Sequence, residues 1–151
     1  MTKLAFAALP IPAKIEYTLL ALIELANLSD PSTPLTVNEI AQRHSIPERY
    51  LEQVLGLLRH HGLVQSQRGN KGGYLLIRKP WQITVFEVVE LVTGSRKRSD
   101  NASSSHLDRE LIVEVWQEAQ AATQSSLKNY TIQDLLQRCL NRKQEHPMFH
   151  I

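Results

Sequence analysis

Two helices predicted in the first half of the chain are separated by only a few residues, and this short connection constrains the fold more than any other feature. Thr36 and Glu39 form the T-x-x-E pattern of a capping box, which predicts a helix that begins there and ends near residues 44–45. Pro47 suits the first position of the next helix. Apolar residues then recur with helical spacing, namely Leu51, Val54, Leu55 and Leu58. Two helices joined by so tight a turn are typical of a helix-turn-helix.

The stretch after these helices is rich in glycine and carries positive charge. QRGNKGGYLL, residues 67–76, lies between strand-like runs at 63–67 and 74–77, and its glycines permit the positive φ angles of a hairpin tip. A nucleotide phosphate loop does not fit, because G-x-x-x-x-G-K-[ST] is absent and a strand rather than a helix follows the glycines. Two interpretations are left, a wing that lies on nucleic acid and a plain surface hairpin with solvated charges.

Positive charge gathers in the same part of the chain. Residues 43–79 hold seven lysines and arginines against two glutamates, a net charge of +5, whereas the whole chain has +2 and the remainder therefore −3. A basic segment in an otherwise mildly acidic chain indicates a polyanion as partner. A merely solvated basic face is the alternative.

Helices are also predicted on both sides of this centre. The spacing of apolar residues over 13–28 predicts an amphipathic helix, and a short core helix is predicted between Thr84, its N-cap, and Gly94. Residues 95–105 are polar and of low complexity, and a last helix is predicted over 130–140. These elements give a mainly α chain with one small hairpin.

The long helix predicted over residues 107–127 has an apolar stripe that a winged domain of ~80 residues is too small to cover. We expect a partner helix on this stripe, most simply the same helix of a second copy. The predicted dimerisation residues are Leu107, Leu111, Ile112, Val115, Trp116 and Ala119.

The predicted fold class is mainly α with a small β-hairpin, a winged helix-turn-helix with a long C-terminal dimerisation helix. The predicted domain organisation is a winged helix-turn-helix DNA-binding domain at residues 1–94, a flexible loop at 95–106, the dimerisation helix at 107–128, and a C-terminal helix and tail at 129–151.

Several segments of the chain together form a recognisable set of motifs. They are KIEYTLLALIELA at 14–26, VNEIA at 37–41, IPERYLEQ at 46–53, LLRHHGLV at 57–64, RGNKGGYL at 68–75 and ITVFEVVELVTG at 83–94. Together they resemble the Rrf-two family of bacterial winged-helix transcription regulators, which includes iron–sulfur-cluster, nitric-oxide-sensing and cysteine-metabolism regulators. The resemblance implies a homodimer on a roughly palindromic operator of double-stranded DNA, with the helix after Pro47 in the major groove and the hairpin in the minor groove.

At the positions that match the family, the resemblance implies that the outer side of this helix and the wing contact DNA. Glutamate accepts from cytosine, glutamine pairs with adenine and arginine with guanine, and each good bidentate pair gives about 1–3 kcal/mol of discrimination. For Tyr50 an alternative stays open, in which the ring packs on the preceding helix and only the hydroxyl reaches DNA. The groove-facing residues are Arg49, Tyr50, Glu52 and Gln53, and the full DNA-binding set adds Thr36, Pro47, Glu48, Arg59, Arg68, Gly69, Asn70, Lys71, Gly72, Gly73 and Tyr74.

The cysteine content bears on cofactors. Cluster-binding relatives hold an iron–sulfur cluster with three cysteines in the loop after the short core helix, and the matching loop here, residues 95–105, contains none. We therefore predict no cofactor, because the conventional three-cysteine site is absent. Cys139 in the last helix is the one cysteine, and we interpret it as a small buried or half-buried residue. A redox-sensing thiol is the alternative, and a metal or cluster site across the dimer stays open.

The compartment follows from the same cysteine count. One cysteine excludes an intrachain disulfide and favours a reducing compartment, so we expect a cytoplasmic protein. The apolar run at residues 4–9 is too short to span a bilayer, and we expect no membrane partner.

These patterns predict a sequence-specific DNA-binding transcription regulator that acts as a homodimer, with repression favoured, although activators use the same DNA surface. The alternatives are a winged-helix module that binds protein and has lost DNA affinity, and a regulator controlled by a protein partner such as cysteine synthase. The second follows from the resemblance to the cluster-free cysteine-metabolism repressor, since cysteine synthase accepts peptides that end in isoleucine and this sequence ends in Ile151. We expect no enzyme, because no paired carboxylates, activated nucleophile or phosphate loop occurs at a recognisable spacing.

Overall fold

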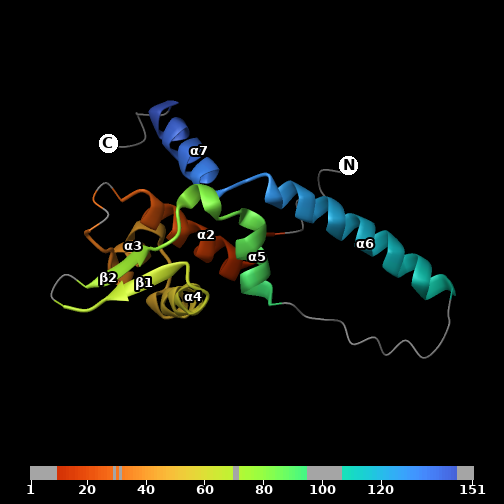
Figure 1. Ribbon diagram of the computed structural model, residues 1–151, viewed down its shortest axis with the longest axis horizontal. Helices are drawn as coiled ribbons and strands as arrows, with labels where there is room; N and C mark the ends of the chain where they lie inside the picture. The colour runs from red at the N-terminus through yellow and green to blue at the C-terminus, as the bar shows by residue number, and fades with distance from the viewer. Residues whose placement is uncertain (1–9, 29, 31, 70–71, 95–106, 146–151) are drawn as a thin grey trace.

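The computed structural model of the chain describes residues 10–28, 30, 32–69, 72–94 and 107–145 (Figure 1). The predicted wing residues Asn70 and Lys71, the predicted loop at 95–106 and the tail that ends in Ile151 lie outside the described residues. The elements, in order, are α2 (Ala13–Ala26), α3 (Val37–His44), α4 (Glu48–His60), β1 (Val64–Gln67), β2 (Gly73–Leu76), the 3-10 helix η1 (Pro80–Gln82), α5 (Val85–Thr93), α6 (Leu107–Lys128) and α7 (Ile132–Glu145). The predicted fold class, mainly α with a small hairpin, is confirmed.

Helix α2 is the central element of the core. It contacts α3, α4, α5 and α7, and Figure 1 shows it between α4 on one side and α7 on the other. Leu22 of α2, Leu55 of α4 and Ile132 of α7 are fully buried. Each side chain of this size contributes about 1.5–3 kcal/mol when it leaves water, so helices far apart in the sequence stabilise one shared core.

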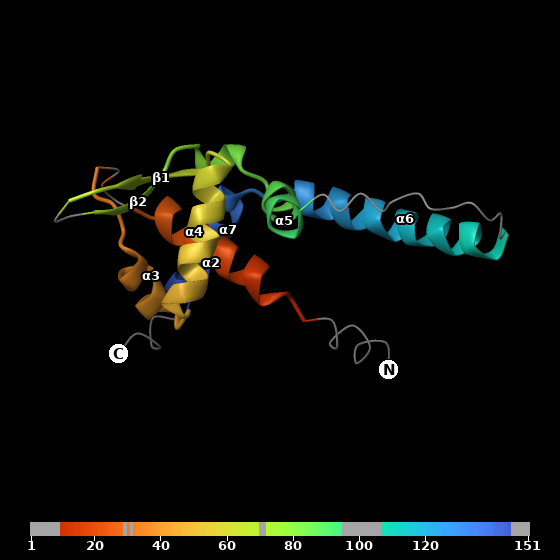
Figure 2. The ribbon, with the colours of Figure 1, turned by 90° about the horizontal axis from the view of Figure 1, so that it is seen from below.

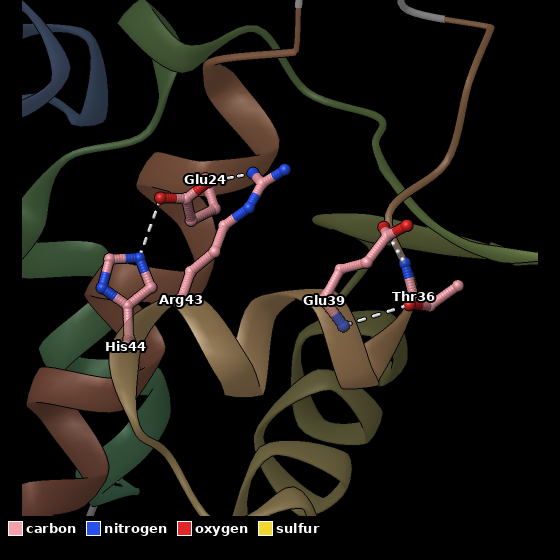
Figure 3. A network of polar contacts seen from close by, with 5 residues as sticks. All are labelled: Glu24, Thr36, Glu39, Arg43 and His44. Carbon is pink, nitrogen blue, oxygen red and sulfur yellow. Dashed lines mark hydrogen bonds and ion pairs between the residues drawn. The ribbon is translucent and has the colours of Figure 1, made fainter.

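The helix-turn-helix consists of α3 and α4. The Thr36 hydroxyl accepts a hydrogen bond from the Glu39 backbone N–H, and the Glu39 carboxylate accepts one from the Thr36 N–H, both at 3.1 Å, so the predicted capping box is present (Figure 3). Ser45 ends α3 in the left-handed conformation, with φ of 53°. The prediction that Pro47 is the first residue of the next helix is wrong by one position: its ψ of 128° is extended, so it is the N-cap and α4 begins at Glu48.

A carboxylate joins the end of α3 to α2 (Figure 3). Glu24, whose side chain is 12% exposed, accepts a hydrogen bond from Arg43 Nη1 at 2.7 Å and shares another with His44 Nε2 at 2.8 Å. Burial raises the pKa of this carboxyl, but the hydrogen bonds and charges of Arg43 and His44 outweigh burial, so the pKa of Glu24 lies below its usual range. The carboxylate is therefore ionised at neutral pH and holds the first helix of the helix-turn-helix against the central helix.

The last helix returns to the winged-helix core. The Ile132 N–H donates to the Ile83 carbonyl at 2.9 Å, and the Val85 N–H donates to the Tyr130 carbonyl at 2.8 Å, so the starts of α5 and α7 are paired. Helix α7 continues to Glu145, five residues beyond the predicted end at Leu140. Ile132 and Leu136 are its buried residues, and Ile132 joins the core formed by α2 and α4.

Helix α6 extends away from this core, as Figures 1 and 2 show. The C-terminal end of α6 contacts α5, and none of the residues of α6 is buried. Among the residues that the structure describes, no helix combines the length and apolar character needed to cross a bilayer.

The base of the hairpin is paired with the loop before α3. The Tyr74 N–H donates to the Leu35 carbonyl at 2.7 Å, and the Leu35 N–H donates to the Tyr74 carbonyl at 3.1 Å. Gly73 lies beside this bridge with φ of 156°, and a Cβ at this position would overlap the Leu35 carbonyl. A side chain at residue 73 would therefore push the wing away from the helix-turn-helix.

Gly73→Ala is expected to destabilise the protein by about 1–3 kcal/mol, the usual cost of overpacking. The matched control is Gly56→Ala in α4, where an added Cβ meets nothing within 4 Å. This control should stabilise the protein by about 0.5–1 kcal/mol, because glycine is unfavourable inside a helix. Denaturant unfolding of both variants checks the prediction, and effects of the same sign would contradict it.

Candidate nucleic-acid interface

Helix α4 has one buried and one exposed side. Its apolar row packs into the core, with Leu51, Leu55 and Leu58 fully buried. The side chains predicted to contact DNA lie outside that row, and Figure 2 shows α4 crossing α2 on the surface of the domain. The exposed residues of the predicted set on this helix and its N-cap are Pro47, Glu48, Arg49, Tyr50, Glu52, Gln53 and Arg59.

The Glu48 carboxylate has a partner inside the protein. Asn38 Nδ2 donates a 2.6 Å hydrogen bond to Glu48 Oε1, which joins the first turns of α3 and α4. Glu52 has no hydrogen-bond or ion-pair partner among the described residues, so of the two predicted carboxylates it is the one with both oxygens available to a base.

Tyr50 lies at the edge of a hollow between α4 and α2. Its side chain is exposed, and it lines the hollow with Gln53 and Val54 of α4 and with Ala13, Lys14 and Tyr17 of α2. The hollow has a volume of about 410 Å³. Tyr50 therefore borders α2 as well as the exposed side of α4.

The wing is the hairpin of β1 and β2. The strands are antiparallel with Val64 opposite Leu76 and Gln67 opposite Gly73. Arg68 and Gly69 are exposed at its tip, and the Gly72 N–H donates to the Gly69 carbonyl at 3.0 Å to form the turn. Arg68 is therefore exposed directly after β1, next to a turn that a backbone hydrogen bond closes.

Three residues of the predicted DNA-binding set also have structural roles. Thr36 caps α3, Gly73 permits close approach to Leu35, and Tyr74 forms the backbone bridge to the same loop. These contacts fix the position of the wing relative to α3 and α4. Backbone groups positioned in this way set the docking geometry even where the side chain itself does not bind a base.

Two of the seven positive charges in the basic segment are neutralised within the protein. Arg43 pairs with Glu24, and Arg78 pairs with both carboxylate oxygens of Glu87 on α5 and with the Gln82 carbonyl at 2.9 Å. In the described part of the chain, Arg49, Arg59 and Arg68 have no carboxylate partner. The net charge of +5 along the sequence thus overstates the charge that this surface offers to a polyanion.

Lys14 and Tyr17 also belong to this surface, although no sequence pattern indicated them. They lie one helical turn apart on α2 and border the same hollow as Tyr50 and Gln53. The K-x-x-Y spacing at 14–17 puts both on one side of a helix, but only the packing of α2 against α4 shows that this side faces the helix-turn-helix.

The predicted dimerisation residues form an exposed row on α6. Leu107 is 80% exposed and Trp116 is 64% exposed, and Leu111, Ile112, Val115 and Ala119 are likewise exposed. Large apolar side chains gathered on one helix in this way are unusual for a surface that stays in water.

The residues do not provide the donors of a three-cysteine iron–sulfur cluster. Cys139 is half-buried on α7, and no other cysteine occurs in the sequence. Within the described ranges, no three side chains of the His, Cys, Asp and Glu types come together as ligands. The guanidinium of the neighbouring Arg138 lies over the Tyr130 ring, 4.8 Å from its centre. No contact between this guanidinium and the Cys139 thiol is observed among the described residues.

Comparison with known proteins gives a consistent set of relatives. The family model described as Rrf2, iron-dependent transcriptional regulator, matches residues 11–138. A regulator of Rhodobacter capsulatus described as HTH-type and rrf2-like is 42% identical over 86 residues, which cover 56% of this chain and 57% of that protein. The HTH-type transcriptional regulator CymR of Bacillus subtilis is 32% identical over 141 residues, which cover 93% of this chain and 99% of CymR.

A solved structure shows the same architecture. The structure of CymR (YrzC), the global cysteine regulator of B. subtilis, matches with a TM-score of 0.70 at 32% identity. The match covers 86% of this chain and 98% of the CymR chain. The similarity therefore extends over the helix-turn-helix, the wing and the helices that follow.

Proposed function

Since the chain belongs to the Rrf2 family of transcriptional regulators and is a DNA-binding regulator rather than an enzyme, we propose that it represses transcription as a homodimer on a palindromic operator. The observation that carries this proposal is the exposure of two arginines, Arg49 on α4 and Arg68 at the tip of the wing. Neither has a carboxylate partner among the described residues, so both are available to DNA.

In this proposal α4 enters the major groove and the wing lies along the minor groove. Arg49 pairs with guanine, Gln53 with adenine, and Glu52 accepts from the amino group of cytosine. Arg68 at the wing tip enters the minor groove and senses its width, because a narrow groove concentrates negative potential. Base contacts then give specificity, and phosphate contacts fix the register.

The dimer in this proposal forms through α6. Two copies of the exposed row that includes Leu111, Ile112, Val115 and Trp116 would cover each other about a two-fold axis. A two-fold dimer with one recognition helix per protomer matches half-sites of a palindrome, one helical turn of DNA or a multiple apart.

We further propose that regulation does not use a three-cysteine cluster. The donor set described above does not fit one, although the family model carries the description iron-dependent. CymR, a relative of similar length, is called a global cysteine regulator, and we propose a protein partner or a small metabolite as the controlling signal here. Thiol oxidation at Cys139 is the redox alternative.

Arg68→Ala is expected to weaken operator binding by about 1–3 kcal/mol while the protein remains dimeric, because the wing loses the positive charge of Arg68. The duplex is one that the wild-type protein selects from a random library, and binding is measured as a function of salt. Arg142→Ala on α7 removes the same charge from an exposed position away from α4 and is the matched control.

Two results would count against the proposed function. If wild-type binding shows no steep salt dependence, phosphate contacts are not formed and the chain acts as a protein-interaction module. If Arg68→Ala and Arg142→Ala have equal effects, the wing takes no part in DNA binding.

A further inference from the structure

The hollow between α2 and α4 combines hydrogen-bond donors with apolar surface. We call it the α2–α4 cradle, lined by Ala13, Lys14, Tyr17, Tyr50, Gln53 and Val54. Figure 2 shows the crossing of α2 and α4 beside which it lies. Its polar groups are an ammonium, two phenolic hydroxyls and a carboxamide, all of which donate hydrogen bonds, and none of the lining residues is acidic. A cation would find no charge partner there, whereas an anion would find one cation and three further donors.

The position of the cradle indicates which kind of anion would bind there. Gln53 and Tyr50 belong to both the cradle and the exposed side of α4, so a ligand in the cradle lies within reach of the residues proposed to read bases. The strand that borders a recognition helix in the major groove presents its phosphates to the neighbouring protein surface. Lysine, tyrosine and glutamine side chains are ordinary donors to such phosphates.

We propose that the α2–α4 cradle binds a backbone phosphodiester of the operator, with Lys14 and Tyr17 as contacts from outside the helix-turn-helix. This inference rests on the proposed function, because it requires α4 to lie in the major groove. Lys14 supplies the charge, Tyr17 and Tyr50 supply hydroxyl donors, and Gln53 contacts either the phosphate or the adjacent base. The contact is independent of sequence and fixes the angle at which α4 enters the groove.

The test compares Lys14→Gln with Lys143→Gln on α7, which removes the same charge from an exposed residue away from the cradle. Both variants are titrated with a random-sequence duplex and with the duplex selected by the wild-type protein, over a range of salt concentrations. Lys14→Gln is expected to weaken binding to both duplexes equally and to reduce the slope of log affinity against log salt by about one for each bound protomer. Lys143→Gln should leave the slope unchanged.

A second variant tests the hydroxyl donor. Tyr17 packs partly against the core, and Tyr17→Phe keeps that ring while it removes only the oxygen. We expect a loss of affinity of about two- to tenfold for both duplexes, the usual effect of one hydrogen bond. Unchanged affinity would remove Tyr17 from the cradle's ligands.

The outcomes separate this inference from the proposed function. If the wild-type protein does not bind DNA, the proposed function fails. If it binds while Lys14→Gln and Lys143→Gln have equal slopes, only the cradle assignment is overturned. Titration of the DNA-free protein with inorganic phosphate distinguishes a free anion: saturable binding that requires Lys14, together with an unchanged slope on DNA, would replace the phosphodiester by a small anionic ligand.

Discussion

Replacing Leu111 and Val115 together by aspartate is expected to turn the proposed dimer into a monomer and to lower operator affinity by about 10²–10⁴-fold, because the second half-site is no longer bound by a linked protomer. Two carboxylates on the apolar row of α6 would have to lose their water in the interface without a partner. Both positions are exposed in the protomer, so the fold of each chain should be retained. Sedimentation velocity and operator binding on the same samples measure the two effects.

The control for this variant carries two new aspartates on the other side of the same helix. Gln117 and Gln124 are exposed and lie on the side of α6 opposite the apolar row by helical spacing. Gln117→Asp with Gln124→Asp should leave the dimer intact. A Leu111/Val115 double variant that still sediments as a dimer would show that α6 does not form the interface.

Ile132→Ala is expected to lower the free energy of unfolding by about 2–5 kcal/mol, the usual cost of truncating a fully buried isoleucine and leaving a cavity. Ile132 opens α7, and its side chain completes the core around α2. Measuring denaturant unfolding in the monomeric Leu111/Val115 variant keeps dissociation out of the measured free energy.

Ile77→Ala is the matched control for this second prediction, because the same atoms are removed from a side chain that is 52% exposed. We expect it to cost less than about 1 kcal/mol. If Ile132→Ala cost no more than Ile77→Ala, α7 would not contribute to the core, and the stability of the winged domain would not depend on the segment after α6.

Features that depend on residues close together in the chain were predictable from the sequence. The Thr36–Glu39 capping box, the apolar row of α4 and the glycine hairpin are all present, and α6 spans Leu107–Lys128 where residues 107–127 were expected. The physical reason is that caps, turns and amphipathic faces depend on residues three to four positions apart, or two apart in strands, which the sequence states directly.

Contacts between distant residues were not predictable in this way. The pairing of Arg43 with Glu24 and of Arg78 with Glu87 removes two cations from a surface that the charge count had assigned to DNA. The approach of Gly73 to Leu35, and the hollow that brings Lys14 beside Tyr50, depend on how separate elements pack. No short-range pattern encodes which charged or small residue meets which partner.

The sequence by itself determined the helix-turn-helix, the wing and the family, because these depend on local periodicity and on motifs of fixed spacing. Only the tertiary structure decided that α7 returns to the core through Ile132, which of the basic residues stay available to DNA, and that α2 contributes Lys14 and Tyr17 to the surface beside α4. These outcomes result from burial and ion pairing between segments far apart in the chain, where the free energy depends on the packed arrangement and not on the order of residues.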